Sequence, residues 1–140
     1  MKLGILREEK IPVDKRTPFS PSQCKRIIND FPNIEIYVQS SQFRCYNDNE
    51  YISNNISVSE DISFCDILFG IKEVPSNNLI ADKTYFFFSH TIKKQDYNRE
   101  LLKNIISLNI RMIDYEVLKF KNGKRILGFG RYAGVIGAYN

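Results

Sequence analysis

A run of aromatic residues that ends in the only histidine of the chain constrains the fold most strongly. Residues 85–88 are all aromatic, and Ser89 and His90 follow them directly. A continuous apolar run of this kind is typical of a strand buried on both faces of a parallel sheet. Because open α/β sheets bind ligands at the carboxyl ends of their strands, the polar end of this run predicts a functional edge.

Two other apolar runs end in charged residues in the same way. Residues 66–71 predict a strand that leads into Lys72 and Glu73, and residues 109–113 predict one that leads into 114–116, which includes Glu116. If the first of these strands lies beside the aromatic one, Lys72, Glu73 and His90 meet at one edge of the sheet. The repeated pattern favours a polar site there.

The remaining strands and helices alternate along the chain. Shorter apolar runs predict strands at 2–6, 34–39 and, more weakly patterned, 56–58. Between and after them, apolar residues recur at helical spacing, most clearly over 96–108, where 97, 101, 102, 105, 106 and 108 are expected on one face. This alternation indicates an α/β fold with a mostly parallel sheet and flanking helices.

Local residue choices predict where two helices begin. Ser20 followed by Pro21 is typical of a helix start, with serine as the cap and proline in the first turn. This helix should end before Phe31-Pro32, because the residue before proline disfavours helix. Asn47 or Asp48 is expected to cap a second, short helix.

The C-terminal part predicts a hairpin and a helix. Asn122-Gly123 lies between apolar runs, which predicts a β-hairpin over 117–129 appended to a Rossmann-like sheet. Small residues at helical intervals over 130–140 predict a helix packed closely against another element. Because this helix reaches the last residue without a cap or polar tail, we expect residues 1–140 to be one domain excised from a larger enzyme.

Composition narrows the class of protein. The 140 residues are 43% hydrophobic and 26% charged, which suits one globular domain. No apolar run approaches the roughly 20 residues of a membrane span, and the net charge of +4 is dispersed, so neither a membrane nor a nucleic acid is expected as a partner. The odd number of widely spaced cysteines predicts free thiols, a cytoplasmic location and no metal site.

Each candidate site residue also has a structural interpretation. His90 suits proton transfer near neutral pH, yet it can equally be a polar residue bonded to backbone at a strand end. Lys72 can act as a base at the sheet edge, or form a solvated pair with Glu73. Arg16 can bind a carboxylate with two parallel hydrogen bonds, or be a charge on a surface loop.

The chain has no recognisable nucleotide-binding turn of its own. Gly128 and Gly130 form a GxG but lack the GxGxxG spacing, and the N-terminal strand leads into charged residues rather than glycine.

Several ordered segments resemble the N-terminal domain of the alanine dehydrogenase and saccharopine dehydrogenase (lysine-forming) superfamily. The likeness is strongest to the lysine–2-oxoglutarate reductase branch, through the sequence FFFSHTIK at 86–93 and RYAG at 131–134. The resemblance covers almost the whole chain, through residues 4–9, 15–21, 70–75, 83–93, 110–116 and 129–134.

The resemblance implies an enzyme of two Rossmann-like domains with the active site in the cleft between them. The second domain, absent here, would bind NAD or NADP, and the substrate would be an amino acid or 2-oxoacid of the saccharopine or alanine type. Carried over by motif, Lys72 and His90 would be the acid–base pair and Arg16 would bind a substrate carboxylate. Glu73 and Glu116 would tune protonation, and Lys93 would add a cation at the edge of the site.

Three hypotheses for function follow. The first is the substrate-side domain of an NAD(P)-dependent oxidoreductase acting on a CH–NH group, inactive in isolation and allowing a homo-oligomer. The second is a stand-alone module that binds an amino acid or oxoacid without catalysis. The third is an oligomer contact through the glycine-spaced tail. The identity of the amino acid and the choice between NAD and NADP are left open.

Overall fold

A six-stranded sheet forms the centre of the chain, with strands in the order β3-β2-β1-β4-β5-β6. The computed structural model describes residues 1–128 and 130–138, without the side chains of 131–133 and 136. All pairings between these strands are parallel, which confirms the predicted α/β fold class. The strands are β1 (Lys2–Ile5), β2 (Glu35–Gln39), β3 (Ser57–Ser59), β4 (Ile67–Phe69), β5 (Thr84–Phe87) and β6 (Arg111–Asp114).

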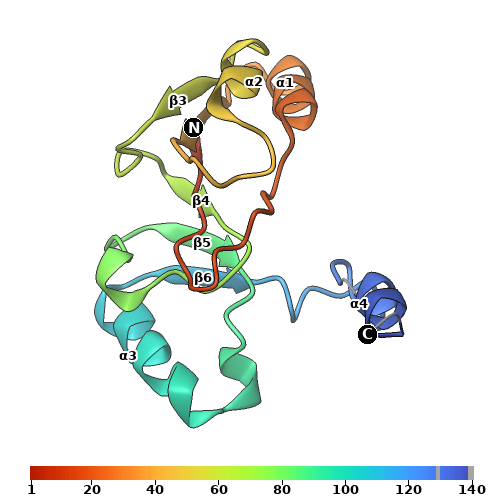
Figure 1. Cartoon of the computed structure of the whole chain (residues 1–140). Coiled ribbons are helices and arrows are strands. Elements are labelled where there is room, and N and C mark those ends of the chain that lie inside the picture. Colours follow the sequence, from red (N-terminus) through yellow and green to blue (C-terminus); the bar gives the residue numbers. More distant parts are fainter. Residues whose placement is uncertain (129, 139–140) are drawn as a thin grey trace.

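Helices cover both faces of the sheet (Figure 1). The helices are α1 (Pro21–Asp30), α2 (Asp48–Ile52), α3 (Arg99–Ser107) and α4 (Gly130–Gly137), with 3-10 turns at η1 (Ser76–Asn78), η2 (Thr91–Lys93) and η3 (Asp96–Asn98). α1 and α2 pack on one face and α3 on the other, as the two separate hydrophobic clusters show. No helix in the described part of the chain has the length and apolar character needed to cross a membrane.

The predicted helix starts are confirmed by reciprocal capping. The Ser20 side chain accepts a hydrogen bond from the backbone of Gln23, whose side chain bonds back to Ser20. Asn47 and Glu50 form the same arrangement at the start of α2. Each pair satisfies two backbone donors that a helix start otherwise leaves without an acceptor.

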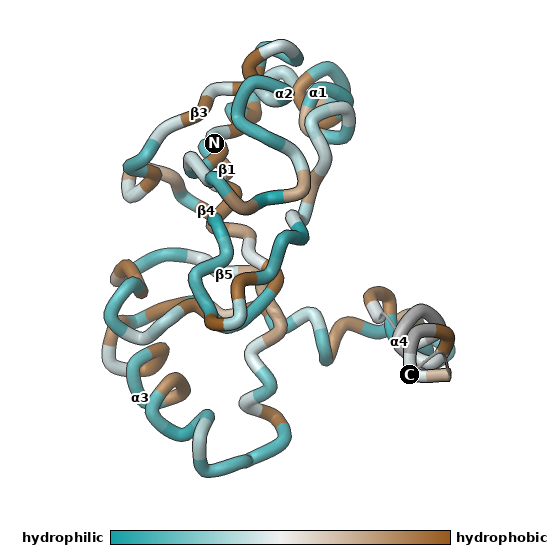
Figure 2. Tube along the Cα trace, in the orientation of Figure 1, coloured by the Kyte–Doolittle hydropathy of each residue, from teal (hydrophilic) through white to brown (hydrophobic). Residues whose placement is uncertain are grey.

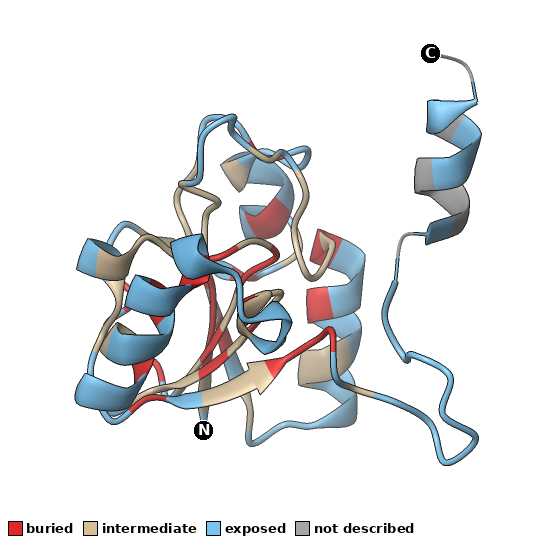
Figure 3. Cartoon of the chain, turned by 90° about the horizontal axis from the view of Figure 1, so that it is seen from below, coloured by how far each residue is buried: buried red, intermediate tan, exposed pale blue. Residues whose placement is uncertain are grey.

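The aromatic strand β5 is packed on both of its faces, as expected. Tyr85 and Phe87 are fully buried in the cluster beneath α3. Phe86 points to the opposite face and stacks on Phe69, with ring centroids 4.6 Å apart. Figure 3 shows the buried residues concentrated in this central layer while the outer sides of the helices are exposed. The polar residues after β5 therefore leave the sheet from a rigid element.

The predicted hairpin over 117–129 is much reduced. A turn closes through Lys119 and Arg125, which form a single antiparallel bridge, and this segment does not join the sheet. Most of the apolar residues around the turn, among them Val117, Phe120 and Ile126, are exposed, so it lacks the hydrophobic packing that a two-stranded hairpin needs. Phe129, the last residue of the predicted hairpin, lies outside the described residues.

Two packing predictions for helices were wrong. In α3 only Leu101 and Ile105 are buried, whereas Leu102 and Ile106 are exposed, because they lie about 100° further round the helix. Figure 2 shows hydrophobic residues on part of each turn of α3.

Helix α4 exists as predicted but stands apart from the rest of the chain (Figure 1). A Cβ added at Gly130, Gly134 or Gly137 would meet no atom within 4 Å, so the expected close packing is absent from the described residues.

Candidate functional site

The charged strand ends predicted from the sequence meet at the carboxyl edge of the sheet. Lys72 and Glu73 follow β4, His90 follows β5 and Glu116 follows β6, while Arg16 comes from the long segment after β1. A pocket of about 250 Å³ lies between them. It is lined by Arg16, Lys72, Phe88, His90, Lys93, Glu116, Arg125 and Gly128.

His90 lies between two buried carboxylates. Its Nδ1 is 3.0 Å from Oε2 of Glu116, and its Nε2 is 4.0 Å from Oε1 of Glu73. Lys93 Nζ is also 3.0 Å from Nδ1, and this nitrogen cannot accept from Lys93 while it donates to Glu116. When Nδ1 carries the proton and bonds Glu116, Nε2 is left with a free lone pair that can take a proton, and Glu73 faces the cation that results.

A buried hydrogen-bond network holds His90 in an unusual backbone conformation. Its φ of 56° places it in the left-handed region, which is strained for residues other than glycine. Ser89, fully buried, donates from Oγ to Oδ2 of Asp114 at 2.6 Å, and Asn98 donates to the His90 carbonyl at 3.2 Å. Asp114 Oδ1 also accepts from the backbone N–H of Glu116 at 2.8 Å. The network thus fixes both members of the His90–Glu116 pair.

Cations surround the Glu116 carboxylate. Lys93 Nζ is 3.4 Å and Arg125 Nη2 is 3.5 Å from its Oε1, and the side chain is only 8% exposed. Burial alone would raise the pKa of Glu116, but the hydrogen bond with His90 and the charges of Lys93 and His90 outweigh it and lower the pKa. Glu116 therefore stays ionised at neutral pH.

We expect the Glu116→Gln variant to lose less stability in acid than the wild-type chain. A carboxylate with a lowered folded-state pKa contributes stability that is complete above its ordinary pKa of 4.5, and that is lost as the pH falls through the folded-state value. Urea unfolding of both chains between about pH 3 and pH 6 measures this slope. The matched control is Glu100→Gln, since Glu100 is 70% exposed. Equal slopes for wild type and Glu116→Gln would contradict the prediction.

Glu73 has one paired and one unpaired carboxylate oxygen. Lys10 Nζ donates to its Oε2 at 2.7 Å. Oε1 is buried and has no hydrogen-bond partner among the described residues, although it is oriented toward His90 Nε2. A buried acceptor without a donor is costly, so this oxygen is available to accept a hydrogen bond from a ligand bound beside His90.

Arg16 is oriented by a neighbouring carboxylate. Its Nε and Nη2 both donate to Asp14, at distances from 2.5 to 3.1 Å. These hydrogen bonds lower the pKa of Asp14, with burial opposing them. The pair holds the guanidinium at the pocket while leaving its side chain 41% exposed.

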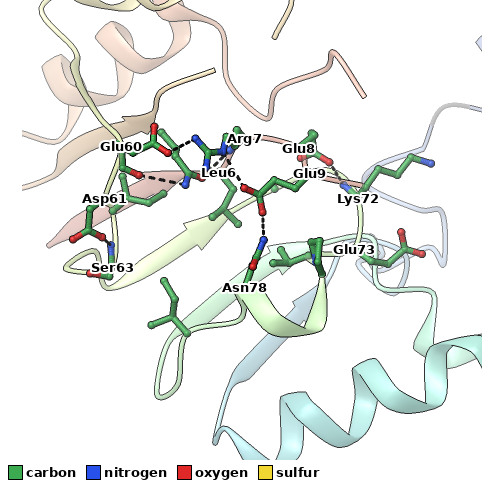
Figure 4. Close-up of a pocket in the computed structure, with 16 residues that line it drawn as sticks. Leu6, Arg7, Glu8, Glu9, Glu60, Asp61, Ser63, Lys72, Glu73 and Asn78 are labelled. Carbon is green, nitrogen blue, oxygen red and sulfur yellow. Dashed lines mark hydrogen bonds and ion pairs between the residues drawn. The ribbon is translucent and has the colours of Figure 1, made fainter. Parts of the chain in front are cut away.

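Lys72 differs from Arg16, Lys93 and Arg125 in that its charged group is not paired with a carboxylate among the described residues. Its side chain is half-buried, and within the described part of the chain its ammonium has no hydrogen-bond or ion-pair partner. Figure 4 shows the amine extending away from Arg7, Glu9 and Asn78. An amine in this state is available to a ligand in the pocket.

A second pocket, of about 260 Å³, lies where the strand order reverses between β1 and β4. Arg7 is held there by Glu9 and Glu60, and Asn78 donates to Glu9 (Figure 4). The carboxylates outnumber the cations along its wall, which comprises Leu6, Arg7, Glu8, Glu9, Gln39, Glu60, Asp61, Ile62, Ser63, Gly70, Lys72, Glu73, Val74, Pro75, Asn78 and Ile80.

The structure thus brings together all the residues singled out in the sequence, while their chemical roles stay predictions. Sequence reasoning missed their supporting partners: Glu8, Lys10, Asp14, Asn98, Asp114 and Arg125. Glu8 and Lys10 come from distant parts of the chain, as with Lys10 and Glu73, which are 63 positions apart. Asp14, two residues before Arg16, and Asp114, two residues before Glu116, could have been found from local spacing.

Comparison with known proteins gives consistent matches over this chain. The family described as "Alanine dehydrogenase/PNT, N-terminal domain" matches residues 4–136. The mitochondrial alpha-aminoadipic semialdehyde synthase of Bos taurus is 38% identical over 99% of the chain, which spans 15% of that protein. The saccharopine dehydrogenase [NAD(+), L-lysine-forming] of Yarrowia lipolytica is 26% identical over 95% of the chain, which spans 37% of that protein.

A solved structure supports the fold. The chain superposes on an L-alanine dehydrogenase with a TM-score of 0.72 and 17% identity, covering 89% of this chain and 35% of that one. At this identity the match shows the fold alone.

Proposed function

The chain belongs to the alanine dehydrogenase/PNT N-terminal domain family, and from this we propose that it forms the substrate side of an NAD(P)-dependent amino-acid oxidoreductase. The reaction would act on a CH–NH group, with saccharopine or alanine as the type of substrate. The observation that carries the proposal is the 250 Å³ pocket, where His90 lies between two carboxylates among several cations.

The charge of the pocket fits a substrate that carries carboxylates. Arg16, Lys72, Lys93 and Arg125 line it, with Glu116 as the only lining carboxylate among the described residues. Arg16 would bind a substrate carboxylate with its guanidinium, whose orientation Asp14 fixes. Lys93, which also contacts Glu116, would add positive charge at the edge.

His90 and Lys72 would carry the proton transfers. The protonated amine of the substrate must lose a proton before hydride leaves the adjacent carbon, and the water that hydrolyses the resulting imine must lose protons as well. His90 would accept these protons at Nε2, with Glu116 selecting the tautomer and Glu73 stabilising the imidazolium. The amine of Lys72, which has no partner in the described part of the chain, would be the second acid–base group.

The crevice formed by the described residues does not suit a dinucleotide. The crevice where the strand order reverses has no glycine turn, and the carboxylates of Glu8, Glu9 and Glu60 there would repel a pyrophosphate. We therefore assign NAD or NADP to a separate domain of the full-length protein. That domain and a second copy of the chain are the proposed protein partners.

The location in the cell is a further proposal. Cys24, Cys45 and Cys65 are free in the structure, and such thiols suit a reducing compartment such as the cytoplasm. The bovine relative carries a mitochondrial name, so fractionation of cells should include both compartments.

The experiment that tests the function is an assay of the full-length protein that carries this chain. Absorbance of the reduced nicotinamide would be followed with lysine plus 2-oxoglutarate and with pyruvate plus ammonia, each with NADH and with NADPH. Oxidation in one mixture would identify substrate and cofactor together. A folded protein that is silent in all mixtures but binds an oxoacid would instead support a binding module without catalysis.

A further inference from the structure

The carboxylate of Glu8 binds the backbone on which Lys72 is mounted. Its Oε1 accepts from the N–H of Ile71 at 2.7 Å, and its Oε2 accepts from the N–H of Lys72 at 2.8 Å. Glu8 follows β1 and Lys72 follows β4, so this contact bridges the point where the strand order reverses. Figure 4 shows the bond between Glu8 and Lys72.

Glu8 also interacts electrostatically with Arg16, the residue proposed to bind a substrate carboxylate. Burial and the charge of Asp14 raise the pKa of Glu8, whereas the two backbone N–H groups and the charge of Arg16 oppose that rise. Gly70 lies directly beside this carboxylate, since a Cβ built there would be in ordinary van der Waals contact with Oε1 of Glu8 at 3.5 Å. Glu8 therefore binds the backbone of Lys72 and also interacts electrostatically with Arg16.

The backbone around Lys72 leaves the sheet just before this contact. The last residue of β4 is Phe69, and beyond it Gly70 donates to the Phe86 carbonyl while Ile71 accepts from Phe88. The next two N–H donors are met by the two oxygens of one side chain. A carboxylate suits this arrangement because both of its oxygens accept, and a side-chain amide does not because its NH₂ would face an N–H.

We propose that Glu8 is a positioning residue that fixes the Ile71–Lys72 backbone and so aims the Lys72 amine into the pocket. The inference rests on the proposed function, in which Lys72 transfers protons. The proposed effect is on the orientation of Lys72. Its amine lies at the end of a flexible side chain, so a small displacement of the Lys72 backbone moves the amine away from the reacting atoms.

The test is a double-mutant cycle in the full-length protein with its oxidoreductase substrates. Glu8→Gln keeps the side-chain size but places a donor against a donor, and we expect it to lower kcat about tenfold or more with KM changed less than about twofold. In a Lys72→Ala background Glu8→Gln should lower kcat by less than about twofold, because that variant has no Lys72 amine to position. Glu9→Gln is the matched control, since the adjacent Glu9 binds Arg7 and Asn78, and it should keep activity.

A second measurement follows the hydrogen bonds of the Ile71 and Lys72 backbone directly. Amide hydrogen exchange at Ile71 and Lys72 should become faster in Glu8→Gln and stay unchanged in Glu9→Gln. If Glu8→Gln does not fold, Glu8→Asp keeps the charge but is too short to reach both N–H groups, and the same cycle and exchange measurement apply to it.

The outcomes separate this inference from the proposed function. The positioning role would be overturned if the losses of kcat from Glu8→Gln and Lys72→Ala added in the double variant. It would also be overturned if Glu8→Gln kept the wild-type kcat although its amide exchange became faster. Either result would leave Lys72 in the mechanism. Wild-type turnover in Lys72→Ala would overturn the role of Lys72 itself, and with it the inference.

Discussion

Replacing His90 by asparagine is expected to lower the turnover of the full-length protein by about 100-fold or more while leaving its fold intact. Asparagine tolerates the left-handed conformation that His90 adopts at φ 56°, so the backbone is preserved. It cannot exchange a proton near neutral pH, and acid–base groups typically contribute 10²–10⁴-fold to rate. His90→Ala should lower turnover as well, with an added cost in stability from the strained backbone.

The measurement is kcat in the mixture that the wild-type protein turns over, with circular dichroism to confirm folding. Lys94→Asn is the matched control, because Lys94 is also left-handed, at φ 53°, yet lies outside the pocket. Turnover near wild type in His90→Asn would remove His90 from the mechanism.

The largest expected effect on stability comes from Arg44. Its side chain is only 2% exposed and pairs with Asp48, with Nη2 and Oδ1 2.6 Å apart. It also donates to the carbonyls of Gln39 and Tyr46 and lies over the ring of Tyr51 at 4.5 Å from the centroid. Arg44→Ala would remove the guanidinium donor from the two carbonyls and the positive charge from Asp48, which keeps hydrogen bonds from Ser40 and Ser41. Removing one partner of a buried ion pair costs about 3–5 kcal/mol.

Urea unfolding of the 140-residue chain measures this loss. A loss of that size is a large part of the roughly 5–15 kcal/mol that holds a domain together. Arg26→Ala is the control, because the Arg26–Asp30 pair has the same spacing but its side chains are 83% and 55% exposed, and it should change the unfolding free energy by less than about 0.5 kcal/mol. A loss below about 1 kcal/mol in Arg44→Ala would show that its contacts do not stabilise the fold.

Local sequence patterns predicted most of the fold because the forces behind them are local. The aromatic run gave β5, and Ser20-Pro21 gave the start of α1, since a strand's apolar faces and a helix cap depend on adjacent residues. The family matched over residues 4–136 confirms the resemblance seen in ordered motifs. The hairpin after β6 was overestimated: the turn forms, but most of the apolar residues around it in the described part of the chain stay exposed.

The position of the site could be predicted, but its supporting contacts could not. Parallel strands end at one edge, so charged residues after β4, β5 and β6 had to approach one another. The partners that orient them depend on chain folding over long separations: Glu8 reaches Lys72 across 64 positions, and Ser89 reaches Asp114 across 25. The burial of Arg44, a charged residue in a polar segment, likewise follows from packing against Tyr51 rather than from its neighbours.

The most direct test of the proton-transfer site is chemical rescue of Lys72→Ala in the full-length protein. We expect turnover to fall strongly and added ethylamine to restore part of it in proportion to amine concentration, since a free amine can occupy the vacated space and exchange the same proton. Full activity in Lys72→Ala without any amine would contradict the account.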